Sequence, residues 1–220
     1  MSGQDLTFEV DGKPANGYLA LPSQPNAPGV LVLHAWWGLN QVFKSLCDRL
    51  AAQGFVAFAP DLNEGRVALT IDEAKQVMSE LDSQRKQAIA VAAVDFLRGR
   101  SEVRKEPLSL IGFSMGAAWS LVLAGERPED IHKAVLFYGA GEGDFEKVKA
   151  EILGHFSDTD EWEEIDYVRA MEADMRKAGL NTVFHIYPNL PHWFFEDDRP
   201  EFDPQAAEVA WERTLEFLRK

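Results

Sequence analysis

The chain has 220 residues, 46% of them hydrophobic, and a formal net charge of −14 from 36 acidic and 22 basic residues. This length suits one large α/β domain, so we expect a single domain over residues 1–220. Such an acidic surface without a Lys or Arg stripe excludes a nucleic-acid-binding protein. No apolar run approaches the ~20 residues of a membrane span, and the first residues lack the features of a signal peptide, so we expect a cytoplasmic protein.

Alternating strands and helices follow an N-terminal hairpin in the predicted order of elements. The hairpin strands are expected at 6–10 and 18–21, around the turn dipeptide Asp11-Gly12. Further strands are expected at 29–34, 55–59, 108–111, 134–138, 152–156 and 181–187, and helices at 42–52, 71–98 (as one or two helices), 115–125, 164–177 and 204–218. Short apolar strands separated by helices predict a mostly parallel sheet of seven to eight strands with helices on both faces.

The single cysteine, Cys47, falls in the predicted helix 42–52. It can form no internal disulfide, and its amphipathic surroundings favour a buried, inert thiol over a reactive one.

A serine stands at the turn between a predicted strand and a predicted helix, in the segment Gly112-Phe113-Ser114-Met115-Gly116. The pattern G-x-S-x-G in this context is typical of a serine nucleophile, because a sharp turn exposes the hydroxyl and small neighbours permit the turn. Ligands of parallel sheets bind beyond the carboxyl ends of the strands, where this segment falls. The loops 60–70 and 139–149 are expected at the same edge and to shape a pocket.

The serine needs a general base, and histidine titrates near neutral pH. His155 and His185 are expected inside or at the end of strands, and His132 precedes a strand at the opposite edge. His34 ends a strand at the correct edge but precedes the serine along the chain. His192 follows the last strand, which suits the usual order of nucleophile, acid and histidine. We therefore predict His192 as the base; the alternative is a loop histidine packed by its neighbour.

The acid that orients this histidine is expected after the strand 152–156, where Asp158 and Asp160 both stand. Position alone favours neither of them as the acid, and the alternative is that one of them is a turn or N-cap aspartate.

Two backbone N–H groups are expected to stabilise the oxyanion of the tetrahedral intermediate. One belongs to Met115, directly after the nucleophile, and the other to Trp36, in the loop after an early strand. Trp36 and Trp37 also have a simpler interpretation as side chains that line or plug the pocket.

Seven segments share one family pattern along the chain. They are 34–40, 55–62, 112–118, 137–139, 154–160, 191–194 and 210–218. Together they resemble the dienelactone hydrolase family of the α/β-hydrolase superfamily, over roughly residues 5–218. The resemblance implies an α/β-hydrolase fold, favours Asp160 over Asp158 as the acid, and supports His192 and the two predicted oxyanion donors.

Three departures from that family pattern bear on the chemistry. The resemblance implies a cysteine nucleophile, where this chain has Ser114, and a thiol-ionising glutamate, where it has Ala35. It also implies arginines that hold the substrate carboxylate. One would follow His192, where residues 193–198 are aromatic and acidic, and Arg66 matches the other only loosely. The loss of such charge-assisted contacts favours a neutral ester over an anionic lactone.

The predicted function is therefore a serine hydrolase that cleaves a small carboxylic ester or lactone through an acyl-enzyme, with no metal or organic cofactor. Substrate contacts are predicted at Trp37, Arg66, Tyr138 and Trp193. The alternatives are a true dienelactone hydrolase (carboxymethylenebutenolidase) acting on an anionic lactone, and a catalytically idle binding module. We expect a monomer or homodimer whose partner is its small-molecule substrate, with no nucleic acid and no membrane.

Overall fold

The computed structural model describes residues 3–220, in which eight strands alternate with six helices and one 3-10 turn. The strands are β1 Gln4–Val10, β2 Lys13–Ala20, β3 Gly29–Leu33, β4 Val56–Pro60, β5 Leu108–Phe113, β6 Ile131–Phe137, β7 Glu151–Ser157 and β8 Thr182–Tyr187. The helices are α1 Gln41–Ala52, α2 Ile71–Glu80, α3 Ser83–Gly99, α4 Met115–Glu126, α5 Ile165–Lys177 and α6 Pro204–Arg219, with the 3-10 turn η1 at Phe145–Lys147.

The sheet is mostly parallel, with the strand order β1-β2-β4-β3-β5-β6-β7-β8. The chain divides into two compact units, of which the first ends at Leu110 and the second begins at Ile111, inside β5. The predicted sheet of seven to eight mostly parallel strands is confirmed, and the prediction of a single domain stays a prediction.

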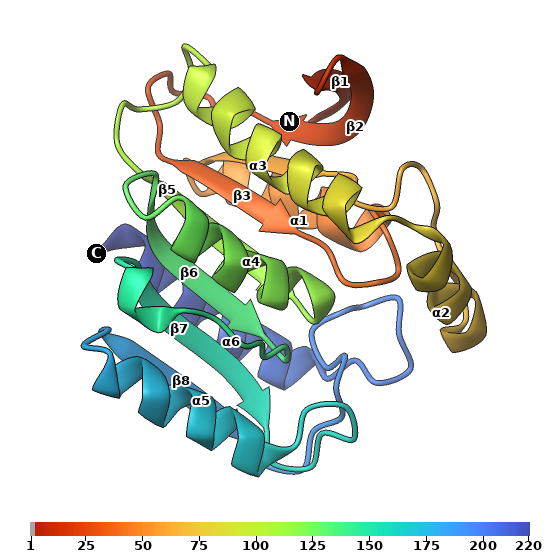
Figure 1. Cartoon of the computed structure of the whole chain (residues 1–220), viewed down its shortest axis with the longest axis vertical. Helices are drawn as coiled ribbons and strands as arrows, with labels where there is room; N and C mark the ends of the chain where they lie inside the picture. Colours follow the sequence, from red (N-terminus) through yellow and green to blue (C-terminus); the bar gives the residue numbers. More distant parts are fainter. Residues whose placement is uncertain (1–2) are drawn as a thin grey trace. The chain divides into compact units, whose positions relative to one another are not determined.

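The first unit begins with the predicted hairpin. Its turn residues Asp11 and Gly12 have positive φ angles of 52° and 73°, and they join the antiparallel pair β1 and β2. Strand β2 is antiparallel to β4, and β4 is parallel to β3. Every residue of β3 and β4 is buried, as their continuous apolar sequence predicts for strands covered on both faces. Figure 1 shows α3 in front of these strands and α1 behind them.

The second unit contains the parallel strands β6, β7 and β8 in consecutive order. Helices α4 and α5 lie on the near side of these strands in Figure 1, and α6 lies behind them. Helix α6 begins as predicted, with Pro204 in its first turn and the Asp203 side chain accepting the Ala206 N–H at 2.8 Å. An N-cap of this kind satisfies an amide that the helix itself leaves unpaired.

Several strands extend beyond their predicted bounds, β2 most of all, because it begins at Lys13 and not at residue 18. The structure also decides between the one or two helices predicted over 71–98. The segment 71–98 forms two helices, because Thr70 and Glu73 form a capping box for α2 and the Asp82 side chain caps α3. Strand β6 begins at Ile131, three residues earlier than predicted, and its pairing with β7 starts at Lys133. His132 therefore lies inside a strand, which corrects the prediction that it precedes one.

Two further expectations concern Cys47 and membrane-spanning segments. Cys47 is completely buried in α1, and burial raises the pKa of its thiol, as expected for an inert cysteine. None of the helices in residues 3–220 has the length and hydrophobicity of a membrane-spanning segment.

Candidate active site

Ser114 occupies the predicted turn between β5 and α4. Its backbone has φ 50° and ψ −114°, a strained conformation for a residue with a side chain. The turn is so tight that a β-carbon at Gly112 would lie 2.2 Å from the carbonyl oxygen of Gly116, and only glycine avoids this clash. The Ser114 N–H donates to the carbonyl oxygen of Phe137 at the end of β6, at 2.9 Å. Strain held in place by its surroundings is typical of functional turns.

A hydrogen-bonded chain joins Ser114, His192 and Asp160, all within the second unit. The Ser114 Oγ lies 2.9 Å from His192 Nε2, and His192 Nδ1 lies 2.7 Å from Asp160 Oδ2. Because the carboxylate can only accept, Nδ1 carries the proton and Nε2 is free to accept from the serine hydroxyl. The side chains of His192 and Asp160 are only 3% and 1% exposed, so water does not screen their interaction.

The loop after β7 holds Asp160 in place. The second carboxylate oxygen, Oδ1, accepts the N–H groups of Trp162 at 2.8 Å and Glu163 at 3.1 Å. Asp158 has a different role, because its exposed carboxylate accepts the Asn189 N–H at 2.7 Å and so links two loops. Of the two aspartates that the sequence left open, Asp160 is the one hydrogen-bonded to His192.

Aromatic rings surround the His192 imidazole. The rings of Tyr138 and Trp193 each lie 5.0 Å from it, centroid to centroid, and the ring of Trp162 lies 6.4 Å away. Tyr138 and Trp193 are buried, whereas Trp162 is 44% exposed. Sequence reasoning did not single out Trp162, although its place two residues after Asp160 is a usable signal.

Two carboxyl groups near this site were also missed, one buried and one half-buried. Glu196 is completely buried, and its Oε1 accepts the Tyr138 hydroxyl at 2.9 Å. Burial raises the pKa of Glu196 to about 8. Glu163 accepts the Ala140 N–H at 3.2 Å, and burial raises its pKa to about 7. Both groups titrate in the neutral range because an ionised carboxylate is poorly stabilised away from water.

The remaining predicted site residues, Trp36, Trp37 and Arg66, belong to the first unit. The carbonyl oxygen of Trp36 accepts the Asn63 side-chain amide at 2.9 Å, and the two tryptophan rings contact each other edge to face at 5.3 Å. Arg66 forms an ion pair with Glu80 of α2. The roles of these three residues in oxyanion or substrate binding stay predictions.

The histidines rejected as bases have partners of their own. His34 accepts the Leu62 N–H at its Nε2 (3.0 Å), inside the first unit. Buried His155 lies between two hydroxyl groups, those of Tyr187 at Nδ1 (2.9 Å) and Thr214 at Nε2 (3.1 Å). His185 stacks on His155 at 5.8 Å from strand β8.

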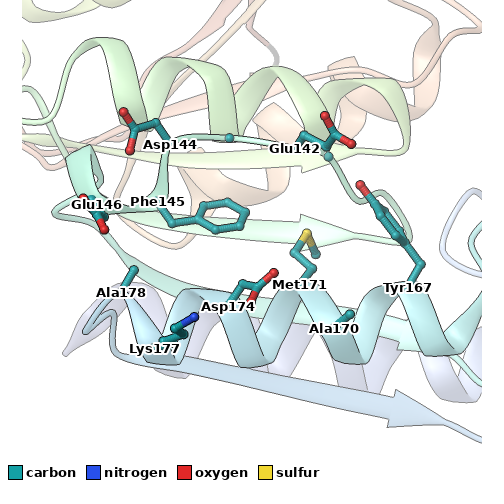
Figure 2. A pocket seen from close by; sticks show the side chains of 12 residues that line it. Glu142, Asp144, Phe145, Glu146, Tyr167, Ala170, Met171, Asp174, Lys177 and Ala178 are labelled. Atoms are coloured by element: carbon teal, nitrogen blue, oxygen red, sulfur yellow. The ribbon is translucent and has the colours of Figure 1, made fainter.

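A cavity of about 500 Å³ lies between the loop after β6 and helix α5 of the second unit. Figure 2 shows the loop residues Glu142 and Phe145 facing Tyr167 and Met171 of the helix. Residues 141–146 of the loop line this cavity, but Ser114, His192 and Asp160 do not, so a pocket at those three residues stays a prediction. Within the described chain, no group of three or more His, Cys, Asp and Glu side chains is arranged to hold a metal ion.

The sheet topology and the serine at its strand-to-helix turn define the α/β-hydrolase fold. A solved structure of a provisionally assigned dienelactone hydrolase from Klebsiella pneumoniae has the same fold, with a TM-score of 0.88 at 22% identity over 100% of both chains.

The chain belongs to the dienelactone hydrolase family, whose model matches residues 15–220. Protein usf of Aquifex pyrophilus is 34% identical over 228 residues, covering 99% of this chain and 98% of its own. A protein of Aquifex aeolicus that is provisionally named carboxymethylenebutenolidase is 31% identical, with the same two coverages. The family resemblance predicted from the sequence is confirmed, and the family is one of hydrolases.

Proposed function

We propose that the protein is a serine hydrolase that cleaves a small carboxylic ester or lactone through an acyl-enzyme. The observation that supports this most strongly is the hydrogen-bonded chain from Ser114 Oγ through His192 to Asp160, with distances of 2.9 and 2.7 Å. A serine hydroxyl is a weak nucleophile by itself, and it becomes effective when a histidine removes its proton during attack.

In the first half of the reaction, the Ser114 oxygen attacks the substrate carbonyl carbon while His192 Nε2 takes the hydroxyl proton. Asp160 stabilises the resulting imidazolium through Nδ1–H. The Met115 N–H at the start of α4 stabilises the oxyanion, helped by the partial positive charge of the helix N-terminus. The Trp36 N–H is the predicted second donor.

Collapse of the tetrahedral intermediate breaks the carbonyl–oxygen bond to the alcohol, and His192 returns its proton to the departing oxygen. Water then attacks the acyl-enzyme with His192 as base, which releases the acid and restores the Ser114 hydroxyl. For a lactone, the acid and the alcohol leave as one hydroxy acid.

A fluorophosphonate probe tests the nucleophile. We expect one label on the wild-type protein and none on Ser114→Ala. Ser120→Ala is the matched control, because Ser120 lies in α4, the helix that directly follows Ser114, and its hydroxyl donates to the Gly116 carbonyl (2.9 Å). Undiminished labelling of Ser114→Ala would refute the nucleophile, and no labelling of the wild type would favour an idle binding module.

We propose a neutral ester as the substrate class. Asp197 and Asp198 stand in the segment that follows His192, where a substrate carboxylate would need a cation. The second candidate is an anionic lactone, which the name of the Aquifex aeolicus relative favours. The ratio of kcat/KM for p-nitrophenyl acetate and for a dienelactone separates the two; a higher value for the dienelactone would overturn the neutral ester.

A further inference from the structure

The three residues that end β6 and follow it lie against the nucleophile turn. The carbonyl oxygen of Phe137 accepts the Ser114 N–H at 2.9 Å. A β-carbon at Gly139 would lie 2.2 Å from the Ser114 carbonyl oxygen, so backbone meets backbone on this side as well. Tyr138 stands between these two contacts, and its ring packs on His192 at 5.0 Å. Tyr138 thus lies beside both the nucleophile turn and the base.

The backbone of Tyr138 is strained. Its φ of 35° lies in the left-handed region, which costs a residue with a side chain about 1–3 kcal/mol. Such a conformation persists only where the surroundings determine it. Here the Tyr138 N–H donates to the His155 carbonyl at 2.8 Å, and the phenol hydroxyl donates to Glu196 Oε1 at 2.9 Å. The residue is therefore held both at its backbone and at its hydroxyl group.

Glu196 belongs to the same loop as His192, four residues further along the chain. The loop folds back on itself, because the Glu196 N–H donates to the Trp193 carbonyl and the Glu196 carbonyl accepts the Arg199 N–H, both at 3.0 Å. The bond from Tyr138 to the Glu196 carboxyl therefore ties the loop that carries the base to the strand end beside the nucleophile.

The second carboxyl oxygen, Glu196 Oε2, is buried and has no hydrogen-bond partner among the described residues. An ionised carboxylate in this state is costly, which is why the Glu196 pKa rises to about 8. The neighbouring Asp198 and Glu201 raise it further, while the Tyr138 hydroxyl and Arg199 oppose the rise. Near neutral pH the carboxyl is thus mainly protonated. It holds the phenol as a neutral acceptor.

We propose that Glu196 and Tyr138 form a positioning pair for His192. The Glu196 carboxyl fixes the phenol, and the phenol ring keeps the imidazole in line between Ser114 and Asp160. Neither residue exchanges a proton with the substrate in this role. The kinetic test of this proposal rests on the proposed hydrolase function. A second test, which observes the His192 ring, is independent of that function.

The kinetic test compares Tyr138→Phe, Glu196→Ala and Glu196→Gln, with turnover counted per fluorophosphonate-reactive site. Tyr138→Phe keeps the ring and removes the bond, and Glu196→Ala removes the acceptor. We expect each to lower kcat by about 10-fold to 100-fold with KM within about twofold, because small displacements of a catalytic group are costly. Glu196→Gln keeps an acceptor oxygen and the neutral charge, so kcat should stay within about threefold. Combining Tyr138→Phe with Glu196→Ala should lower kcat no further than the more affected single variant.

The matched control is Tyr187→Phe. It removes another buried phenol hydroxyl that is hydrogen-bonded, here to His155, which lies outside the catalytic chain. If the effect of Tyr138→Phe came from a general loss of packing or stability, Tyr187→Phe would lower kcat by a similar factor. The positioning role instead predicts that the kcat of Tyr187→Phe stays within about twofold of the wild type. An unchanged kcat per reactive site in both Tyr138→Phe and Glu196→Ala would overturn the proposal.

The second test observes His192 directly, by nitrogen NMR of its imidazole. We expect one sharp Nδ1-protonated tautomer in the wild type and Glu196→Gln, and a broadened or mixed signal in Tyr138→Phe and Glu196→Ala. This readout needs no substrate. A wild type without label or turnover would contradict the proposed function alone, while an identical His192 spectrum in all four proteins would contradict the positioning pair alone.

Discussion

The second unit contains two buried histidines, His192 and His155, that are bonded on both ring nitrogens. His192 lies between a carboxylate, Asp160, and the hydroxyl of Ser114. His155 lies between two hydroxyl groups, from Tyr187 and Thr214. The number of hydrogen bonds is the same, and the distances, between 2.7 and 3.1 Å, are similar.

What separates them is the charge of the partner. Burial, together with nearby His185 and Arg213, holds the pKa of His155 well below its usual range, so this ring stays neutral and structural. His192 has a carboxylate against Nδ1, which can stabilise the imidazolium that forms when the ring accepts a proton. A buried histidine is a candidate base when one ring nitrogen faces an anionic partner and the other faces a nucleophile. Two hydroxyl partners do not stabilise the imidazolium in this way.

The largest expected effect comes from replacing the two histidines in turn. His192→Gln should lower kcat for p-nitrophenyl acetate by about 10⁴-fold or more, because it removes the general base. His155→Gln should keep kcat within about threefold and lower the melting temperature, because it disturbs buried hydrogen bonds. Equal losses of kcat in the two variants would remove the distinction between them.

The next effect concerns the carboxylate. Asp160→Asn gives His192 a neutral partner, as His155 has, and should lower kcat by about 10³- to 10⁴-fold. Asp158→Asn is the control, since that carboxylate accepts the loop amide of Asn189, whereas His192 Nδ1 is bonded to Asp160; we expect kcat within about threefold. The same steady-state assay measures both. A small effect of Asp160→Asn would show that His192 needs no anionic partner.

The smallest effect is the pH dependence of stability. The lowered pKa of His155 means that the unfolded chain takes up a proton at this residue that the folded chain excludes. Its contribution is fully present above about pH 6.5 and is lost as pH falls toward the folded pKa. Between pH 7.5 and 5, the melting temperature of His155→Gln should therefore fall less than that of the wild type. Each ~1 kcal/mol of difference in stability corresponds to about 2–4 °C for a chain of this size. Thermal denaturation at the two pH values measures this; equal losses would contradict the assignment.

The sequence predicts the elements and the place of the nucleophile because these depend on local patterns. Apolar runs between turn residues locate the strands, and Asp203 followed by Pro204 locates the start of α6. The order of the chain then selects His192, because a residue that follows a parallel strand lies at the same edge as one that follows its neighbour.

Other features depend on contacts that no local pattern encodes. Asp158 and Asp160 both follow β7 closely, and only the path of the loop decides which carboxylate reaches His192. The pairing of Tyr138 with Glu196 joins residues 58 positions apart. The positive φ of Tyr138 could not be predicted from the sequence, because glycine is the residue expected at such angles and this position has a tyrosine.

The φ of 50° at Ser114 limits which nucleophiles this position accepts. A β-branched residue such as threonine is sterically excluded from this backbone conformation, whereas cysteine has the same branching as serine and fits the same turn. The exchange of oxygen for sulfur is therefore a change of one atom that leaves the backbone as it is. In evolutionary terms, the turn fixes the geometry of attack, and the attacking atom can be either oxygen or sulfur.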